Sequence, residues 1–383
     1  MKTMYTTDKI RQRFRLKASG TQYRTLWQVL HLDPFLLLSL LALITFGFFI
    51  LYSASNQNFD IILQEIIHIS FALLLMFIIA QLHPSIYQRW SPWLFGVGTL
   101  LLITVLIIGH INKGAQRWLS LGFLHFQPSE IMKLAIPMIL AWFYTYRPLP
   151  PKTKDLLLST LIILIPVMLT IKEPDLGTAV ILAIGGSCIL FLAGMRWRLI
   201  FLLILLMLIA APIMWHFLHG YQQQRLLTFF NPERDPLGAG YHIIQSKIAI
   251  GSGGILGKGW LQGTQSHLHF LPEHSTDFIF AVCGEEFGLL GSITLLLIYL
   301  CIIARCIYIT MRSQNTYTRL LSGSLTLMFF FSVFINLGMV CGILPVVGIP
   351  LPLISYGGSS MITTMASFGI LMSIHGHRNL LSQ

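Results

Sequence analysis

Runs of about 20 apolar residues recur along almost the whole chain, and they limit what it can fold into more than any other feature. A helix that rises 1.5 Å per residue crosses a hydrocarbon core of about 30 Å with each such run. Helix is required because lipid offers no partner for backbone N–H and C=O groups. Only 10% of the residues are charged, against about 25% in soluble domains. We therefore predict an all-α polytopic membrane protein.

The apolar runs predict ten transmembrane helices. We place them at Pro34–Tyr52, Ile61–Gln81, Trp90–His110, Glu130–Tyr146, Leu156–Ile171, Leu176–Leu192, Trp197–Phe217, Phe278–Tyr308, Leu320–Leu344 and Pro352–Ile374.

The basic residues give these spans a direction. Most of them cluster on one side of the predicted spans, which is the cytoplasmic side by the positive-inside rule. Both termini are then cytoplasmic, with a basic tail at 1–33, a membrane domain at 34–374 and a short tail at 375–383. Because the net charge of +11 lies in short clusters beside apolar runs, we read it as a topology signal and not as nucleic-acid binding. The five cysteines also fall in or beside apolar runs, so neither disulfides nor structural zinc are expected.

Residues 218–277 form a large extracytoplasmic loop between predicted helices 7 and 8, too long for a plain connector. The loop is rich in histidine and carries four carboxylates, Glu233, Asp235, Glu273 and Asp277. We expect the chemistry to occur in this loop, with short amphipathic or re-entrant pieces near Ser246–Ile255 at the membrane surface.

Asp277 ends the loop, immediately before an apolar run. A carboxylate at the mouth of a membrane is partly desolvated, which makes it a stronger base when it is ionised. The alternative is that Thr276 or Asp277 caps the following helix, and the residues alone favour neither reading.

Two other features of the loop are weaker. The glycine-rich stretch 251–259 does not fit a P-loop, so it is either a flexible turn or a loop that approaches a lipid pyrophosphate through its amides and Lys258. The histidines His267, His269 and His274 match no standard zinc spacing and are read as solvated. Mg²⁺ or Mn²⁺ held by Asp277 and a substrate pyrophosphate stays open.

Charged pairs inside the predicted spans indicate a polar interior, since charges facing lipid are costly. Glu130 and Lys133 are three residues apart and share a helix face, so they either set helix packing or take part in chemistry. Glu65 and His68 form a similar pair. At least one of Glu285 and Glu286 should face protein or water.

Several longer motifs resemble the SEDS family (shape, elongation, division and sporulation proteins) over nearly all of residues 34–374. They are Arg117-Trp-Leu, Phe126-Gln-Pro-Ser-Glu-Ile-Met-Lys133, Pro174-Asp-Leu-Gly-Thr178, Asp235-Pro-Leu-Gly-Ala-Gly-Tyr241, Thr276-Asp-Phe-Ile-Phe280, Glu285-Glu-Phe-Gly288 and Ile354-Ser-Tyr-Gly-Gly-Ser359. The sequence of residues 245–254 is more similar to that of the cell-elongation members than to that of the division members.

The resemblance implies a peptidoglycan glycosyltransferase with ten transmembrane helices in the bacterial cytoplasmic (inner) membrane. Such proteins polymerise lipid II into glycan strands on the periplasmic side, for cell elongation and rod-shape maintenance, with a class B penicillin-binding protein as transpeptidase partner. The family's essential aspartate falls on Asp277, its ion pair on Glu130 and Lys133, and its Arg-Trp element on Arg117 and Trp118. Two departures are Ser275, in place of the usual histidine, and Glu173, in place of a common glutamine.

We therefore expect Asp277 to activate the acceptor 4-hydroxyl for inverting transfer, with release of undecaprenyl pyrophosphate. Other residues expected to bind substrate or support the site are Arg117, Trp118, Lys258, Gln245, Ser246, Asp175, Glu285 and Ser355. A flippase for lipid-linked precursors and a non-catalytic scaffold for a transpeptidase are the alternatives.

Overall fold

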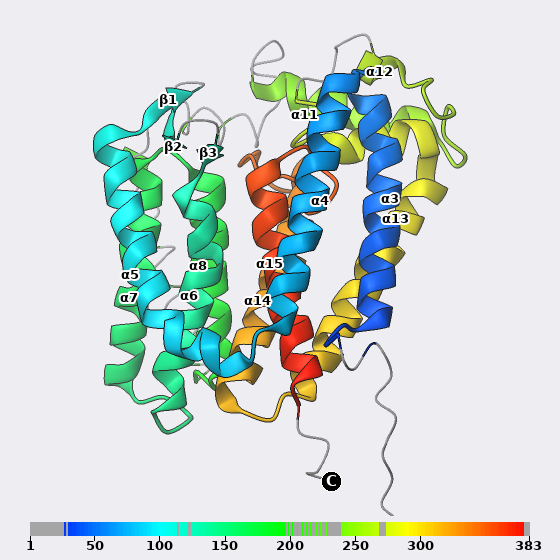
Figure 1. The fold of residues 1–383 in the computed structure, drawn as a ribbon. Helices are drawn as coiled ribbons and strands as arrows, with labels where there is room; N and C mark the ends of the chain where they lie inside the picture. Colours follow the sequence, from blue (N-terminus) through cyan, green and yellow to red (C-terminus); the bar gives the residue numbers. More distant parts are fainter. Residues whose placement is uncertain are drawn as a thin grey trace, which may run out of the picture.

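Helices running between two ends of the molecule make up most of this computed structural model (Figure 1). It describes residues 30–378, apart from 113–114, 122–123, 268–272 and most positions between 197 and 238. The strands, α11 (Ala239–Gly253) and α12 (Thr264–His267) lie at one end, which we call the loop end. The opposite end, with residues 30–33 and 375–378, we call the terminal end.

The predicted spans coincide with helices, except for Trp197–Phe217, which lies largely outside the described residues together with most of the N-terminal tail and residues 379–383. The helices are α3 (Pro34–Ala54), α4 (Phe59–Gln81), α5 (Pro84–Ile108), α6 (Pro128–Thr145), α7 (Thr153–Lys172), α8 (Leu176–Leu192), α13 (Ile279–Met311), α14 (Thr316–Val340) and α15 (Gly358–Gly376). Six of those in the described part are long and apolar enough to cross a membrane. The chain is a polytopic membrane protein.

The prediction of an all-α fold is wrong between α5 and α6. There the chain forms a small antiparallel sheet at the loop end, made of β1 (His110–Asn112), β2 (Ala115–Leu121) and β3 (Leu124–Phe126) in the order β1-β2-β3. Backbone outside the apolar runs still needs hydrogen-bond partners, and an antiparallel ladder supplies them locally.

The last helix also begins later than predicted, at Gly358 and not at Pro352. The intervening backbone is not helical because it pairs with another segment: the Tyr356 N–H donates to the Ser275 carbonyl at 2.9 Å. Helix α13 is interrupted at Gly288, whose φ of +64° lies in the left-handed region that glycine tolerates.

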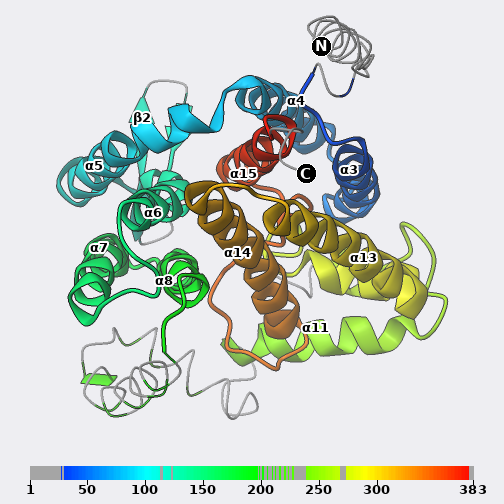
Figure 2. The same ribbon diagram turned by 90° about the horizontal axis from the view of Figure 1, so that it is seen from below.

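Helix α14 lies at the centre of the bundle when it is viewed along the helices (Figure 2). Of the residues in its most apolar window 67% are buried, against 22% in α4, α5 and α13, so those three helices lie more on the outside of the bundle. Helices α6, α8 and α13 pack against α14, α4 packs along α15, and α3 packs along α13. The helix α11 (Ala239–Gly253) crosses the loop end, where it contacts α13 and α14.

Polar groups close the terminal end. Asp33 caps α3 by accepting from the Leu36 N–H at 3.0 Å, and it also accepts from the Arg305 guanidinium of α13 at 2.7 Å. The rings of His31 and His377 stack at 4.0 Å, and the His83 ring meets His377 edge-on at 5.1 Å. The segments before α3 and after α15 are thereby tied to the α4–α5 turn.

Candidate functional site

Asp277 lies in a turn at the loop end, immediately before α13. The N-cap position of α13 is Phe278, whose own side chain makes no capping hydrogen bond. The helix therefore begins one residue later than a cap at Asp277 would require. The Asp277 side chain is half-buried, so it is accessible at the mouth of the helix bundle.

Three consecutive carbonyl groups hold the Asp277 segment in place. The Ser275 carbonyl accepts from the Tyr356 N–H at 2.9 Å, and the Thr276 carbonyl accepts from Ser355 Oγ at 2.6 Å. The Asp277 carbonyl accepts from Asn336 Nδ2 at 2.9 Å. All three donors come from α14 or from the segment that joins α14 to α15.

The Asp277 carboxylate lies against Gly348 of the same joining segment. A Cβ atom at Gly348 would be 3.5 Å from Asp277 Oδ2, and the glycine has a φ of +75°. A side chain at this position would be strained and would occupy space beside the carboxylate. Glycine therefore lets the backbone turn closely under Asp277.

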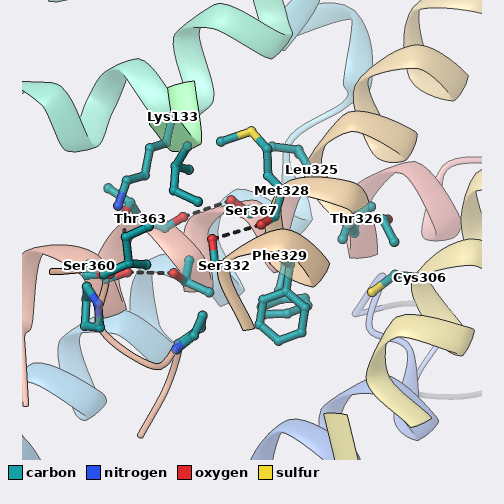
Figure 3. Close-up of a pocket in the computed structure, with 17 residues that line it drawn as sticks. Lys133, Cys306, Leu325, Thr326, Met328, Phe329, Ser332, Ser360, Thr363 and Ser367 are labelled. Carbon is teal, nitrogen blue, oxygen red and sulfur yellow. Dashed lines mark hydrogen bonds between the residues drawn. The ribbon is translucent and has the colours of Figure 1, made fainter. Parts of the chain in front are cut away.

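Glu130 and Lys133 form the predicted ion pair in the first turns of α6, at 2.6 Å. The second oxygen of Glu130 accepts from Thr363 Oγ1 of α15 at 2.8 Å, and Glu130 itself is buried. Lys133 lines a cavity of about 50 Å³ between α6, α14 and α15, and Figure 3 shows it beside Thr363 and Ser360. The pair therefore places a cation on a cavity wall and also joins two helices.

The cavity and Asp277 share a border. Ile349 and Pro350, which directly follow Gly348, line the same cavity as Lys133. Its volume has room for a few water molecules and not for a sugar. Asp277 and Lys133, both implied by the family resemblance, thus lie on either side of the short segment 348–350.

Among the described residues, Arg117 on β2 bonds to backbone carbonyls and not to a carboxylate. Its guanidinium donates to the Glu173 carbonyl at 3.3 Å and also to the Pro174 carbonyl. Asp175 caps α8 by accepting from the Thr178 N–H at 3.1 Å, and its other oxygen accepts from Gln127 Nε2 at 2.8 Å. The α7–α8 turn is thereby fixed to the start of α6. Trp118 is half-buried on the same strand.

Glu173, in this same turn, is fully buried. Both of its carboxylate oxygens lack a hydrogen-bond partner among the described residues. Burial and, to a smaller extent, the Asp175 charge raise the pKa of Glu173 to about 8, against the opposing effect of Arg117. The carboxyl is therefore largely protonated at neutral pH.

Glu285 and Glu286 are both buried on α13, as the cost of charge in lipid predicts. Glu285 accepts from Lys258 Nζ at 2.6 Å and from the Thr264 N–H at 2.9 Å. Ser53 of α3 donates to Glu286. In this arrangement Lys258 anchors the glycine-rich stretch to α13, and its predicted role toward a pyrophosphate stays a prediction.

Ser246 is buried on α11, and its hydroxyl donates to the Val340 carbonyl of α14 at 2.8 Å. Gln245 is half-buried on the same helix. His269, Glu233 and Asp235 lie outside the described residues. In the part of the chain that is described, no three His, Cys, Asp or Glu side chains are grouped as a metal site would require.

Asn336 is the residue at the site that sequence reasoning missed. It is completely buried on α14, and its Nδ2 atom also donates to the Ile349 carbonyl at 2.8 Å. An amide within a predicted apolar span is a detectable signal, because an unpaired amide in lipid is costly.

The helices and their polar loop end define a polytopic membrane protein whose candidate site lies where the bundle meets that end. Its sequence matches the FtsW/RodA/SpoVE family of cell cycle proteins over residues 27–380. The chain therefore belongs to this family, which is the SEDS family.

Individual relatives agree with this assignment. The chain is 50% identical to the peptidoglycan glycosyltransferase MrdB of Escherichia coli (strain K12), over 94% of this chain and 98% of that protein. It is 32% identical to the peptidoglycan glycosyltransferase RodA of Treponema pallidum, over 90% of this chain and 98% of the relative.

Two solved structures are similar in fold. One, from a peptidoglycan synthase complex described as coordinating polymerization and crosslinking, has a TM-score of 0.79 at 34% identity and covers 91% of this chain and 99% of its own. The rod shape determining protein RodA of Thermus thermophilus has a TM-score of 0.69 at 29% identity and covers 91% of this chain and 98% of its own.

Proposed function

We propose that this chain is a peptidoglycan glycosyltransferase that polymerises lipid II into glycan strands during cell elongation. The observation that carries the proposal is that Asp277 lies against Gly348. The residues directly after Gly348 line the same cavity as Lys133. The 50% identity to a peptidoglycan glycosyltransferase over nearly the whole chain supports it.

Asp277 acts as the general base. Its carboxylate takes the proton of the acceptor sugar's 4-hydroxyl, and the oxygen attacks C1 of the donor from the face opposite the pyrophosphate. The new C1–O bond forms as the bond from C1 to the phosphate oxygen breaks, and undecaprenyl pyrophosphate leaves with the electron pair. The configuration at C1 is inverted.

Lys133 is the best placed cation for the leaving group, because it lines the cavity beside the Asp277 segment. All three cations already have partners: Lys133 pairs with Glu130, Arg117 donates to two backbone carbonyls and Lys258 pairs with Glu285. Each would have to share or exchange a partner to act. Mg²⁺ or Mn²⁺ would be held by Asp277 together with the substrate's own phosphates, and would neutralise charge on the pyrophosphate.

The loop end faces the periplasm, both termini are cytoplasmic, and the chain crosses the inner membrane ten times. The clustering of basic residues on one side of the spans supports this orientation. A class B penicillin-binding protein is the partner that cross-links the product. The similar fold within a complex that joins polymerization and crosslinking supports that partnership.

The test is polymerisation of lipid II by the full-length chain with its transpeptidase partner in liposomes. Asp277→Asn should lower the rate by at least about 10²-fold, since general-base catalysis contributes about 10²–10⁴. The matched control is Glu273→Gln, which removes an exposed carboxylate of the same turn and should keep its activity. Full activity of Asp277→Asn would remove it from the mechanism. Lipid movement across the bilayer without polymer would favour a flippase.

A further inference from the structure

The C-terminal part of the chain binds the backbone of the Asp277 segment. Carbonyls 275, 276 and 277 accept from the Tyr356 N–H, Ser355 Oγ and Asn336 Nδ2, at 2.9, 2.6 and 2.9 Å. Loop carbonyls can instead bond to water, which would hold the segment less firmly. Here each has a fixed donor from the protein.

Asn336 differs from the other two donors because it joins two segments. Its single amide nitrogen donates both to the Asp277 carbonyl at 2.9 Å and to the Ile349 carbonyl at 2.8 Å. The two carbonyls fix the orientation of the amide, since only the NH₂ group can donate to both. Asn336 thereby ties the segment that carries the base to the segment that lines the Lys133 cavity.

The cost of burial indicates what this amide does. Asn336 is fully buried, and its Oδ1 has no hydrogen-bond partner among the described residues. An amide that donates two hydrogen bonds but leaves its own oxygen unpaired returns only part of the cost of its burial as stability. The remaining benefit is the geometry that the two donated bonds impose.

We propose that Asn336 is a positioning residue for Asp277, which it holds at a fixed distance from the cavity of Lys133. This inference rests on the proposed role of Asp277 as the base. It explains how a base carried by a turn is kept in reacting position, since a displacement of about 1 Å costs on the order of 10² in rate.

The test compares Asn336→Leu with Ser324→Ala in the full-length chain. Ser324 is a matched control because it is also fully buried on α14 and donates to a backbone carbonyl, that of Gly185, at 2.9 Å. We expect Asn336→Leu to lower kcat by about 10- to 100-fold with less than about a twofold change in KM for lipid II. Ser324→Ala should change neither constant, even where it lowers Tm.

A second readout does not depend on the chemistry. The Thr276 and Phe278 N–H groups donate to the Glu273 carbonyl within the turn, at 3.1 and 3.2 Å. Asn336→Leu should speed hydrogen exchange at both amides by about tenfold, and Ser324→Ala should not. If Asn336→Leu does not fold, Ser355→Ala removes the bond to the Thr276 carbonyl, together with the bond that Ser355 Oγ accepts from the Leu351 N–H at 2.8 Å. It should give a weaker version of both effects.

The outcomes separate the two proposals. An inactive Asp277→Asn beside an Asn336→Leu variant with normal kcat would overturn the positioning role and leave the base in place. Normal activity of Asp277→Asn would overturn the proposed base, while the exchange rates would still show whether Asn336 holds the turn. If hydrogen exchange at the Thr276 and Phe278 amides is unchanged in Asn336→Leu, the positioning role is overturned, whether or not Asp277→Asn is active.

Discussion

Replacing Glu173 by glutamine should stabilise the protein by an amount that grows with pH. The carboxyl is buried without a hydrogen-bond partner among the described residues, and burial raises its pKa from 4.5 to about 8. A carboxyl whose pKa is raised by folding binds its proton more tightly in the folded state. The protonated carboxyl therefore carries no penalty below pH 4.5, and stability is lost as the pH rises toward 8 because ionising the buried group is costly.

The size of the effect follows from the shift. Each pKa unit corresponds to about 1.36 kcal/mol, so the ionisable carboxyl costs about 3 kcal/mol at pH 7 relative to a neutral side chain, and close to nothing at pH 4. With an unfolding entropy of about 2.1 cal/mol/K per residue over 383 residues, this difference is about 4 °C in Tm.

Thermal unfolding of the purified protein between pH 4.5 and pH 8.5 measures this difference. Glu173→Gln and the wild type should unfold together at the acid end and separate steadily as the pH rises. Asp60→Asn removes the same charge from an exposed position at the start of α4 and serves as the control. A gap in Tm that stays constant across the range would refute the assignment of a buried, largely protonated Glu173.

Two further predictions concern packing and the terminal end. Gly253→Ala should lower Tm and the yield of folded protein, because its Cβ would collide with the Gly284 carbonyl oxygen, whereas Gly251→Ala meets nothing within 4 Å and should be tolerated. Burial and two neighbouring histidines lower the pKa of His377 against the opposing effect of a backbone hydrogen bond. Stability should therefore fall as the pH drops below 6.5, and His377→Gln should reduce that fall in a pH series of Tm measurements.

The spans could be predicted because residues that contact lipid are almost always apolar. The ends of α8 were predicted to the residue, since Leu176–Leu192 is bounded by polar and glycine-containing turns. Pro352–Gly357 was misassigned because its residues are apolar for another reason: they are buried under the Asp277 turn and not in lipid. Hydropathy measures removal from water and does not distinguish the two.

Parts of the site could also be predicted, where the partners are close in sequence. Glu130 and Lys133 share a helix face, so their pairing followed from spacing. Lys258 and Glu285 are 27 residues apart, and only the fold shows that they meet. Asn336 was missed for the same reason, since it acts on a carbonyl 59 residues away.

Fixing Asp277 from α14 has a mechanical consequence. The loop that carries Asp277 is long, and α13, which follows it, is interrupted at Gly288, so neither neighbour in the chain can hold the carboxylate at a set depth. Helix α14 can, because it is the most buried of the long apolar helices and packs against α6, which carries Lys133. The distance between the proposed base and the proposed cation is then determined by helix packing in the core, where interiors deform little. Disturbing the α6–α14 contact should therefore change kcat through the distance between Asp277 and Lys133.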